Sequence, residues 1–131
     1  MSNQKIRSEL EQKLQAWNVD HPEVDIVLEG ESYIKADNSF LETFLLPNVT
    51  RDVTVDGKRQ RYVGIFQINI WVKDNVGTGP ADRLADSLIA YFPIVPKTGR
   101  VSVEKTPWAA KPILEDGWRV VPLTIQYRYE S

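Results

Sequence analysis

The feature that most constrains the fold is a pair of segments on either side of a tight turn in the middle of the chain. Asp56–Gly57 separates residues 49–55 from residues 59–72, and an Asp-Gly dipeptide suits the positive backbone angles of a hairpin turn. The second segment places one set of residues on a single strand face: Tyr62, Phe66, Ile68, Ile70 and Val72, with Gly64 in the same row. The opposite face is half polar and carries Trp71, so it either is solvated or contacts another subunit. These segments therefore predict a long β-hairpin with one buried face.

Two other segments have the spacing of amphipathic helices. Residues 2–17 carry one apolar stripe, formed by Ile6, Leu10, Leu14 and Trp17, and Pro22 marks its end because proline cannot continue helical hydrogen bonding. A second apolar stripe begins after Pro80, which suits a first helical position, and reaches Phe92. We expect two helices, each with one buried face.

Shorter segments complete the predicted sheet. They are residues 24–28, 40–46, 101–103 and, after the Asp116–Gly117 turn, 120–129. The last segment alternates strictly and predicts one buried face, formed by Val121, Leu123, Ile125, Tyr127 and Tyr129. Pro122 has no amide donor, which favours an edge or a bulge at the start of the last strand. The segment 106–112, which holds Trp108, is interpreted as a loop.

This order of elements favours an α+β fold, in which a mainly antiparallel β-sheet has two α-helices packed on one face. The chain has 131 residues, enough to bury a core without a metal or a disulfide. Residues 1–131 are expected to form a single domain.

The residue types that carry out catalysis or bind metals are scarce. The chain has no cysteine and one histidine, which excludes disulfides, thiolate metal sites and cysteine nucleophiles. His21 has no second histidine to act with it, so we interpret it as a surface residue. Two carboxylate pairs adjoin glycines in turns and are interpreted as solvated charges: Glu29 with Glu31, and Glu115 with Asp116. We expect no catalytic residue, no cofactor and no metal site.

Charge does not identify a partner. Sixteen Lys and Arg against eighteen Asp and Glu give a net charge of -2, which does not favour DNA or an anionic membrane. The N-terminus is polar, and no apolar run approaches the ~20 residues of a membrane span. The protein is expected in the cytosol, without membrane contact.

A basic cluster and a glycine-containing connection are interpreted as structural features, without a binding role. The basic residues near the hairpin tip favour a solvated sheet edge, with a nucleic-acid groove as the alternative; they are Arg51, Lys58, Arg59 and Arg61. The connection 74–82 lacks the Lys-Ser/Thr ending of a phosphate-binding loop, so we interpret it as a strand-to-helix connector, with a protein-contact loop or a weak divalent-cation site as the alternatives.

The candidate protein-contact residues lie in two loops and on one sheet face. Asn75, Val76 and Thr78 lie in a glycine-flanked loop, and an apolar Val76 with no apolar neighbours favours burial by a partner. Trp108 lies in a proline-flanked loop, where restricted backbone freedom lowers the entropy cost of presenting a large side chain. Trp71, on the half-polar strand face, is the fifth candidate. For Trp71 and Trp108 the alternative is packing in the core of the chain itself.

Four segments, in this order, resemble the phage tail terminator or tail-completion family, including short prophage-encoded proteins of unknown function. They are FLETFLLP (residues 40–47), RYVGIFQINIWV (61–72), GTGPADRLADSLIAYF (77–92) and GWRVVPLTIQYRY (117–129). With the N-terminal helix, the resemblance covers nearly the whole chain.

The resemblance implies a non-enzymatic structural protein that assembles as a homo-oligomeric ring, typically a hexamer, on the end of the tail tube. Such a ring stops polymerisation of the tail tube protein and offers a surface to a head-tail connector protein, while DNA only passes through its lumen. The protein would occur in the bacterial host cytoplasm during assembly and then in the virion tail. The alternatives are a neck or head-tail joining protein, a small-ligand-binding α+β domain, and a nucleic-acid module.

Overall fold

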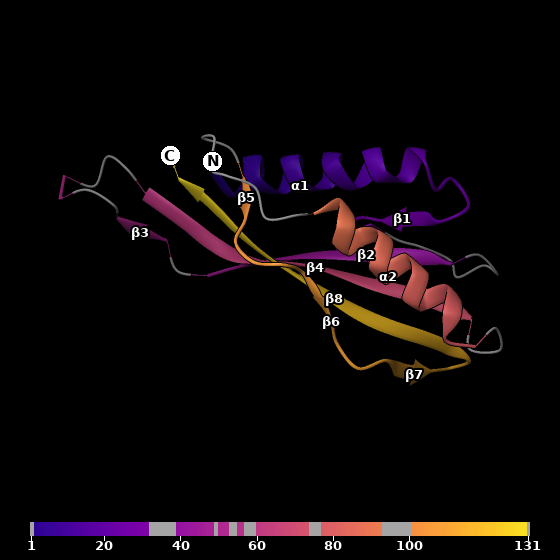
Figure 1. Cartoon of the computed structure of the whole chain (residues 1–131). Helices are drawn as coiled ribbons and strands as arrows, with labels where there is room; N and C mark the ends of the chain where they lie inside the picture. The colour runs from indigo at the N-terminus through magenta and orange to yellow at the C-terminus, as the bar shows by residue number, and fades with distance from the viewer. Residues whose placement is uncertain are drawn as a thin grey trace.

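The computed structural model describes residues 2–31, 39–48, 50–52, 55–56, 60–73, 77–92 and 101–130. In these residues the elements follow the order α1 (Ser2–Val19), β1 (Asp25–Val27), β2 (Phe40–Pro47), β3 (Arg51–Asp52), β4 (Gln60–Lys73), α2 (Gly79–Tyr91), β5 (Ser102–Val103), β6 (Trp108–Ala109), β7 (Ile113–Glu115) and β8 (Trp118–Glu130). Both helices lie on the same face of the sheet (Figure 1). The predicted α+β class is confirmed.

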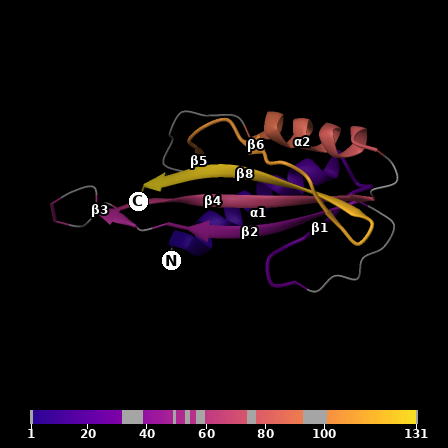
Figure 2. The same cartoon turned by 90° about the horizontal axis from the view of Figure 1, so that it is seen from below.

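The sheet is built around the two longest strands, β4 and β8. Its order is β1-β2-β4-β8-β5, with β3 paired to β4, and with β6 and β7 paired to β8. The pair β1–β2 is parallel, whereas the other strand pairs of the described residues are antiparallel. Figure 2 shows β2, β4 and β8 side by side, with α1 behind them and α2 beyond β8.

The predicted hairpin is present, but its first strand differs from the prediction. The described part of residues 49–55 contains only the short strand β3, and the long partner of β4 is β2. The register explains this pairing, because Leu41 lies across from Ile70 and Leu45 across from Phe66, so that both strands bury the same face. Gly57, at the predicted turn, lies outside the described residues.

The main core lies between the helices and the sheet. The predicted stripe of α1 is fully enclosed, and the predicted apolar rows of β4 and β8 face it. Its largest fully buried side chains are Trp17, Tyr127, Phe66, Phe92, Ile6 and Leu14. These rows confirm the sequence interpretation of both helices and of the two long strands.

The opposite face of the sheet, here called the outer face, carries a second and smaller cluster. Its members are Val27, Phe40, Trp71, Trp118 and Val120. Trp71 stacks on Phe40 with ring centroids 5.3 Å apart, and it meets Trp118 edge to face at 6.2 Å. One end of the outer face is therefore packed within the chain itself.

One prediction about the C-terminal third is wrong, and a second is wrong in one of its two alternatives. The segment around Trp108 is not only loop, because β6 and then β7 pair with β8. Pro122 is not on an edge, since β8 lies between β4 and the shorter strands. The alternative, a bulge, agrees with the register, because the three residues 110–112 lie opposite only two residues of β8, 121–122. The carbonyl of Pro122 accepts the amide of Ala110 at 2.8 Å, and in antiparallel strands the N–H and C=O of one residue face the same side. The missing amide therefore falls where β6 ends and does not interrupt the β4 ladder.

Candidate protein-contact surfaces

The residues 105–114, here called the arm, hold three of the six exposed large hydrophobic side chains among the described residues. Trp108 is 41% exposed, Ile113 55% and Leu114 63%. Trp108 lies across from Thr124 and Ile113 across from Val120, which places both side chains on the outer face of the sheet. The arm thus presents a tryptophan and an isoleucine in one direction.

The arm is held to the sheet by its own backbone. Pro107 is buried, and the amide of Ala110 donates to Pro122. The ammonium of Lys105 stands 5.4 Å from the centre of the Trp108 ring, within the range of a cation–π contact. Trp108 is therefore exposed in a restricted position, as expected for a contact residue.

Ile113 and Leu114 were not among the predicted contact residues. The signal that could have identified their strand is the Asp116–Gly117 dipeptide, because a two-residue turn implies a strand on each side of it. Both turn residues have positive φ, 49° for Asp116 and 80° for Gly117. β7 and the start of β8 are that hairpin, with Glu115 across from Trp118.

The other predicted contact residues lie elsewhere. Thr78 is exposed and precedes α2 as its N-cap, where its side chain makes no capping hydrogen bond. Asn75 and Val76 lie outside the described residues. Trp71 is only 8% exposed, and its indole N–H donates to Glu42 at 3.2 Å. Its contact with another chain stays a prediction, as do those of the other four residues.

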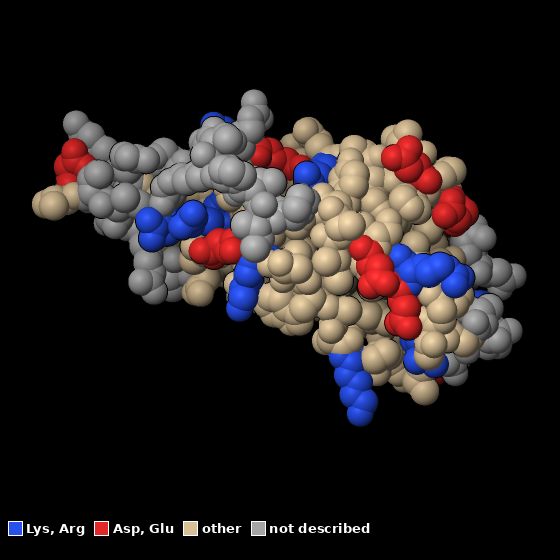
Figure 3. All heavy atoms as spheres, viewed as in Figure 1, with Lys and Arg blue, Asp and Glu red and all other residues tan. Residues whose placement is uncertain are grey.

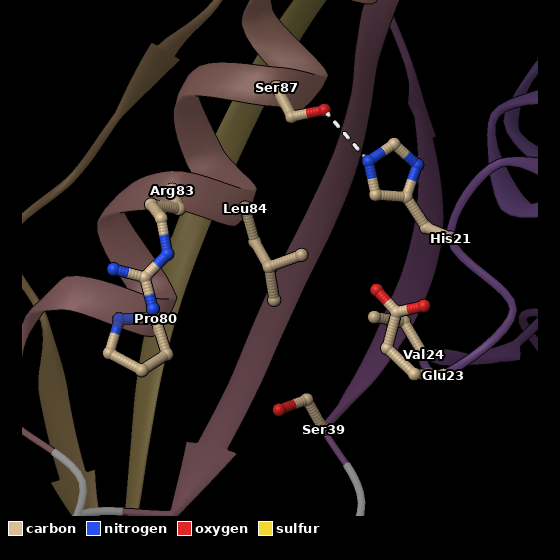
Figure 4. A pocket seen from close by; sticks show the side chains of 8 residues that line it. All are labelled: His21, Glu23, Val24, Ser39, Pro80, Arg83, Leu84 and Ser87. Atoms are coloured by element: carbon tan, nitrogen blue, oxygen red, sulfur yellow. Dashed lines mark hydrogen bonds between the residues drawn. The ribbon is translucent and has the colours of Figure 1, made fainter.

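A pocket of about 420 Å³ lies between the α1–β1 connection and α2, here called the α2 pocket. Its apolar lining is Val24, Pro80 and Leu84, and its polar lining includes His21, Glu23, Arg83 and Ser87 (Figure 4). The size lies within the range of about 300–1,000 Å³ that is usual for ligand-binding pockets. The α2 pocket is therefore large enough to receive a bulky side chain.

One wall of the α2 pocket is fixed by a chain of hydrogen bonds. The indole N–H of Trp17 donates to the Ser87 hydroxyl at 3.0 Å, and this hydroxyl lies 3.4 Å from Nε2 of His21. Nδ1 of His21 lies 3.0 Å from the Trp17 carbonyl oxygen, and the His21 ring stacks on the Trp17 indole with centroids 4.1 Å apart. Because a carbonyl only accepts, Nδ1 carries a proton, and in the neutral ring Nε2 then accepts from Ser87.

This arrangement corrects the interpretation of His21 as a surface residue, since its ring is half-buried between two helices. Here Nδ1 faces a backbone carbonyl, and the Ser87 hydroxyl already accepts the Trp17 N–H. The three side chains join α1 to α2.

Glu29 also has a structural role, contrary to its interpretation as a solvated turn charge. Its Oε1 lies 2.6 Å from the Arg7 guanidinium and accepts the Leu45 amide at 2.9 Å. The hydrogen bond from Arg7, followed by the one from Leu45, lowers the pKa of the Glu29 carboxyl. Glu31 accepts the amide of Leu28 within its own turn. Glu29 therefore ties α1 to β2.

Charges of both signs are scattered over the face shown in Figure 3, around a broad uncharged area. Within the described ranges, no three His, Cys, Asp or Glu residues are grouped so that they could hold a metal ion. None of the helices described is both long and apolar enough to cross a membrane.

The same fold occurs in a solved structure that is 26% identical to this chain. The two superpose with a TM-score of 0.77, over 98% of this chain and 95% of the other. The chain is therefore an α+β protein with the same fold as this solved structure. No curated protein matches it.

The family follows from a second comparison. The sequence profile of the phage tail terminator protein family matches residues 5–127. The chain therefore belongs to the phage tail terminator family, a family of structural phage proteins, and the resemblance seen in its four segments is confirmed.

Proposed function

We propose that this chain forms a homo-oligomeric ring, a hexamer, that caps the phage tail tube, ends its polymerisation and provides the surface that joins the head. The observation that carries the proposal is the family match over residues 5–127. The exposed arm supports it, because a ring needs a surface that binds a different surface on the next copy.

The partners are further copies of the chain, the tail tube protein and a head-tail connector protein. DNA passes through the ring lumen without being held. The net charge of -2 supports this part of the proposal, because a strongly basic lumen would retain the phosphates. The protein acts without catalysis, first in the bacterial host cytoplasm and then at the end of the virion tail.

Removing the gene from the phage tests this function. We expect tail tubes of irregular and excessive length without heads, and tubes of normal length when the full chain is supplied from a plasmid. Electron microscopy with a labelled antibody should place the protein at one end of the tube. Label along the whole tube would contradict the capping role, and headless tubes of normal length would favour a neck protein instead.

A further inference from the structure

We infer that the arm of one subunit docks into the α2 pocket of the neighbouring copy, with the Trp108 side chain as the anchor. This inference rests on the proposed ring and names the contact that closes it.

The arm has the properties of an inserted segment. Its three large apolar side chains are between 41% and 63% exposed, although β6 and β7 are hydrogen-bonded to β8. Prolines at positions 107 and 112 restrict its backbone. A restricted segment loses little conformational entropy when it binds, and tryptophan is among the residues that most often dominate binding energy.

The α2 pocket has the properties of a receptor for such a side chain. Val24, Pro80 and Leu84 supply apolar contact, and Glu23, Ser87 and His21 supply polar groups at its sides. The hydrogen bonds among Trp17, Ser87 and His21 hold the wall in place before binding. A preformed pocket favours one inserted side chain over a flat contact.

The charges of the two surfaces are complementary. The arm carries Lys105 and Lys111 and no acidic residue, whereas residues 20–25, beside the pocket, carry Asp20, Glu23 and Asp25 and neither lysine nor arginine. On the α2 side of the pocket the lining includes Arg83. Opposite charges around an apolar contact fix its register and disfavour wrong partners.

The two surfaces lie on different sides of the sheet. α2 lines the pocket on the helix-covered side (Figure 4), whereas the register places Trp108 and Ile113 on the outer face. A contact between two unlike surfaces is heterologous, and it closes into a ring when the rotation between copies permits. The inferred contact is thus of the kind that the proposed ring requires.

Site-specific cross-linking tests the contact, because the chain contains no cysteine. The full chain with Ile113→Cys and Arg83→Cys is assembled on tails and treated with a short bis-maleimide. We expect a ladder of covalent multimers. The matched control combines Ile113→Cys with Ser8→Cys, an exposed position on α1, and should remain largely monomeric.

The outcomes separate this inference from the proposed function. The arm contact would be overturned if rings cap the tails but the Ile113→Cys, Arg83→Cys variant gives no ladder. It would also be overturned if the Ser8→Cys control cross-links equally well. Either result would leave the capping role standing. Failure of the parent chain to form a ring on tails would overturn both.

Charge reversal gives a second test that does not depend on cysteine geometry. Glu23→Lys and Lys111→Glu should each lower the fraction of capped tails about tenfold, and the double variant should recover most of the loss, as expected for opposed charges across an interface. A double variant no better than the single variants, with all three folded, would contradict the docking geometry.

Discussion

Tyr127 lies directly across from Gly64 in the β4–β8 ladder, and its side chain fills the space that a side chain at position 64 would need. A Cβ on residue 64 would lie 2.5 Å from the Tyr127 hydroxyl oxygen and 2.6 Å from the Leu46 carbonyl oxygen. Tyr127 is fully buried. The glycine in the central strand is therefore required by packing of the aromatic ring across it.

Gly64→Ala should lower the free energy of unfolding by about 1–3 kcal/mol, the usual cost of overpacking a tight site. Denaturant unfolding of the purified chain measures this change. Tyr127→Phe is the matched control, because it removes a buried hydroxyl that has no hydrogen-bond partner among the described residues and should leave stability equal or slightly higher. An alanine at position 64 as stable as the parent would contradict the packing argument.

Glu29 predicts a specific pH dependence. Its pKa is lowered in the folded protein, so its contribution to stability is full above its ordinary pKa of 4.5 and is lost as pH falls through the lowered value. The Glu29 side chain is 34% exposed and that of Arg7 37%, so solvent screening limits this contribution to about 1 kcal/mol or less.

Thermal unfolding of Glu29→Gln and the parent from neutral to acid pH measures this contribution. The difference in stability between the two should be largest near neutral pH and should shrink below pH 4.5. Glu115→Gln, in exposed β7, is the matched control and should leave the pH profile of the parent unchanged. A difference that stays constant with pH would show that Glu29 does not act through its charge.

The sequence predicts those elements whose apolar pattern repeats several times. The apolar residues of α1 and of β8 recur often enough to predict which face of each element is buried, and both predictions are confirmed. β6 and β7 have two and three residues, too few for any period. They form because the backbone of residues 108–115 pairs with the side of β8 that does not face β4. This pairing depends on tertiary structure and has no local sequence signal.

The same distinction applies to the candidate site. Trp108 could be singled out because its flanking prolines are local in the sequence. The outer cluster could not be foreseen, since Phe40, Trp71 and Trp118 meet only through the register of three strands. The prediction that His21 is a surface residue is wrong for the same reason, because its partner Ser87 belongs to the second helix and is distant in sequence.

The Trp17–Ser87 hydrogen bond gives a prediction about the junction of the helices. Trp17 is 1% exposed, so Ser87→Ala leaves its indole N–H buried without an acceptor and should cost about 1–3 kcal/mol. In a Trp17→Phe background, which has no donor, the same serine substitution should cost clearly less. A double-mutant cycle by denaturant unfolding measures the coupling, and additive effects would mean that the hydrogen bond contributes nothing.

Trp108 and Trp118 form a matched pair for separating contact from packing. Trp118 is 5% exposed within the outer cluster and Trp108 is 41% exposed on the arm. Trp118→Ala should therefore lower stability by about 3–5 kcal/mol. Trp108→Ala should leave thermal unfolding nearly unchanged but reduce capping strongly, because an interface anchor commonly contributes about 2 kcal/mol or more to binding. Circular dichroism melting and tail lengths in a complementation assay are measured for both. Early melting of the Trp108 variant would assign this residue to the core, and normal tail lengths would make it an ordinary surface residue.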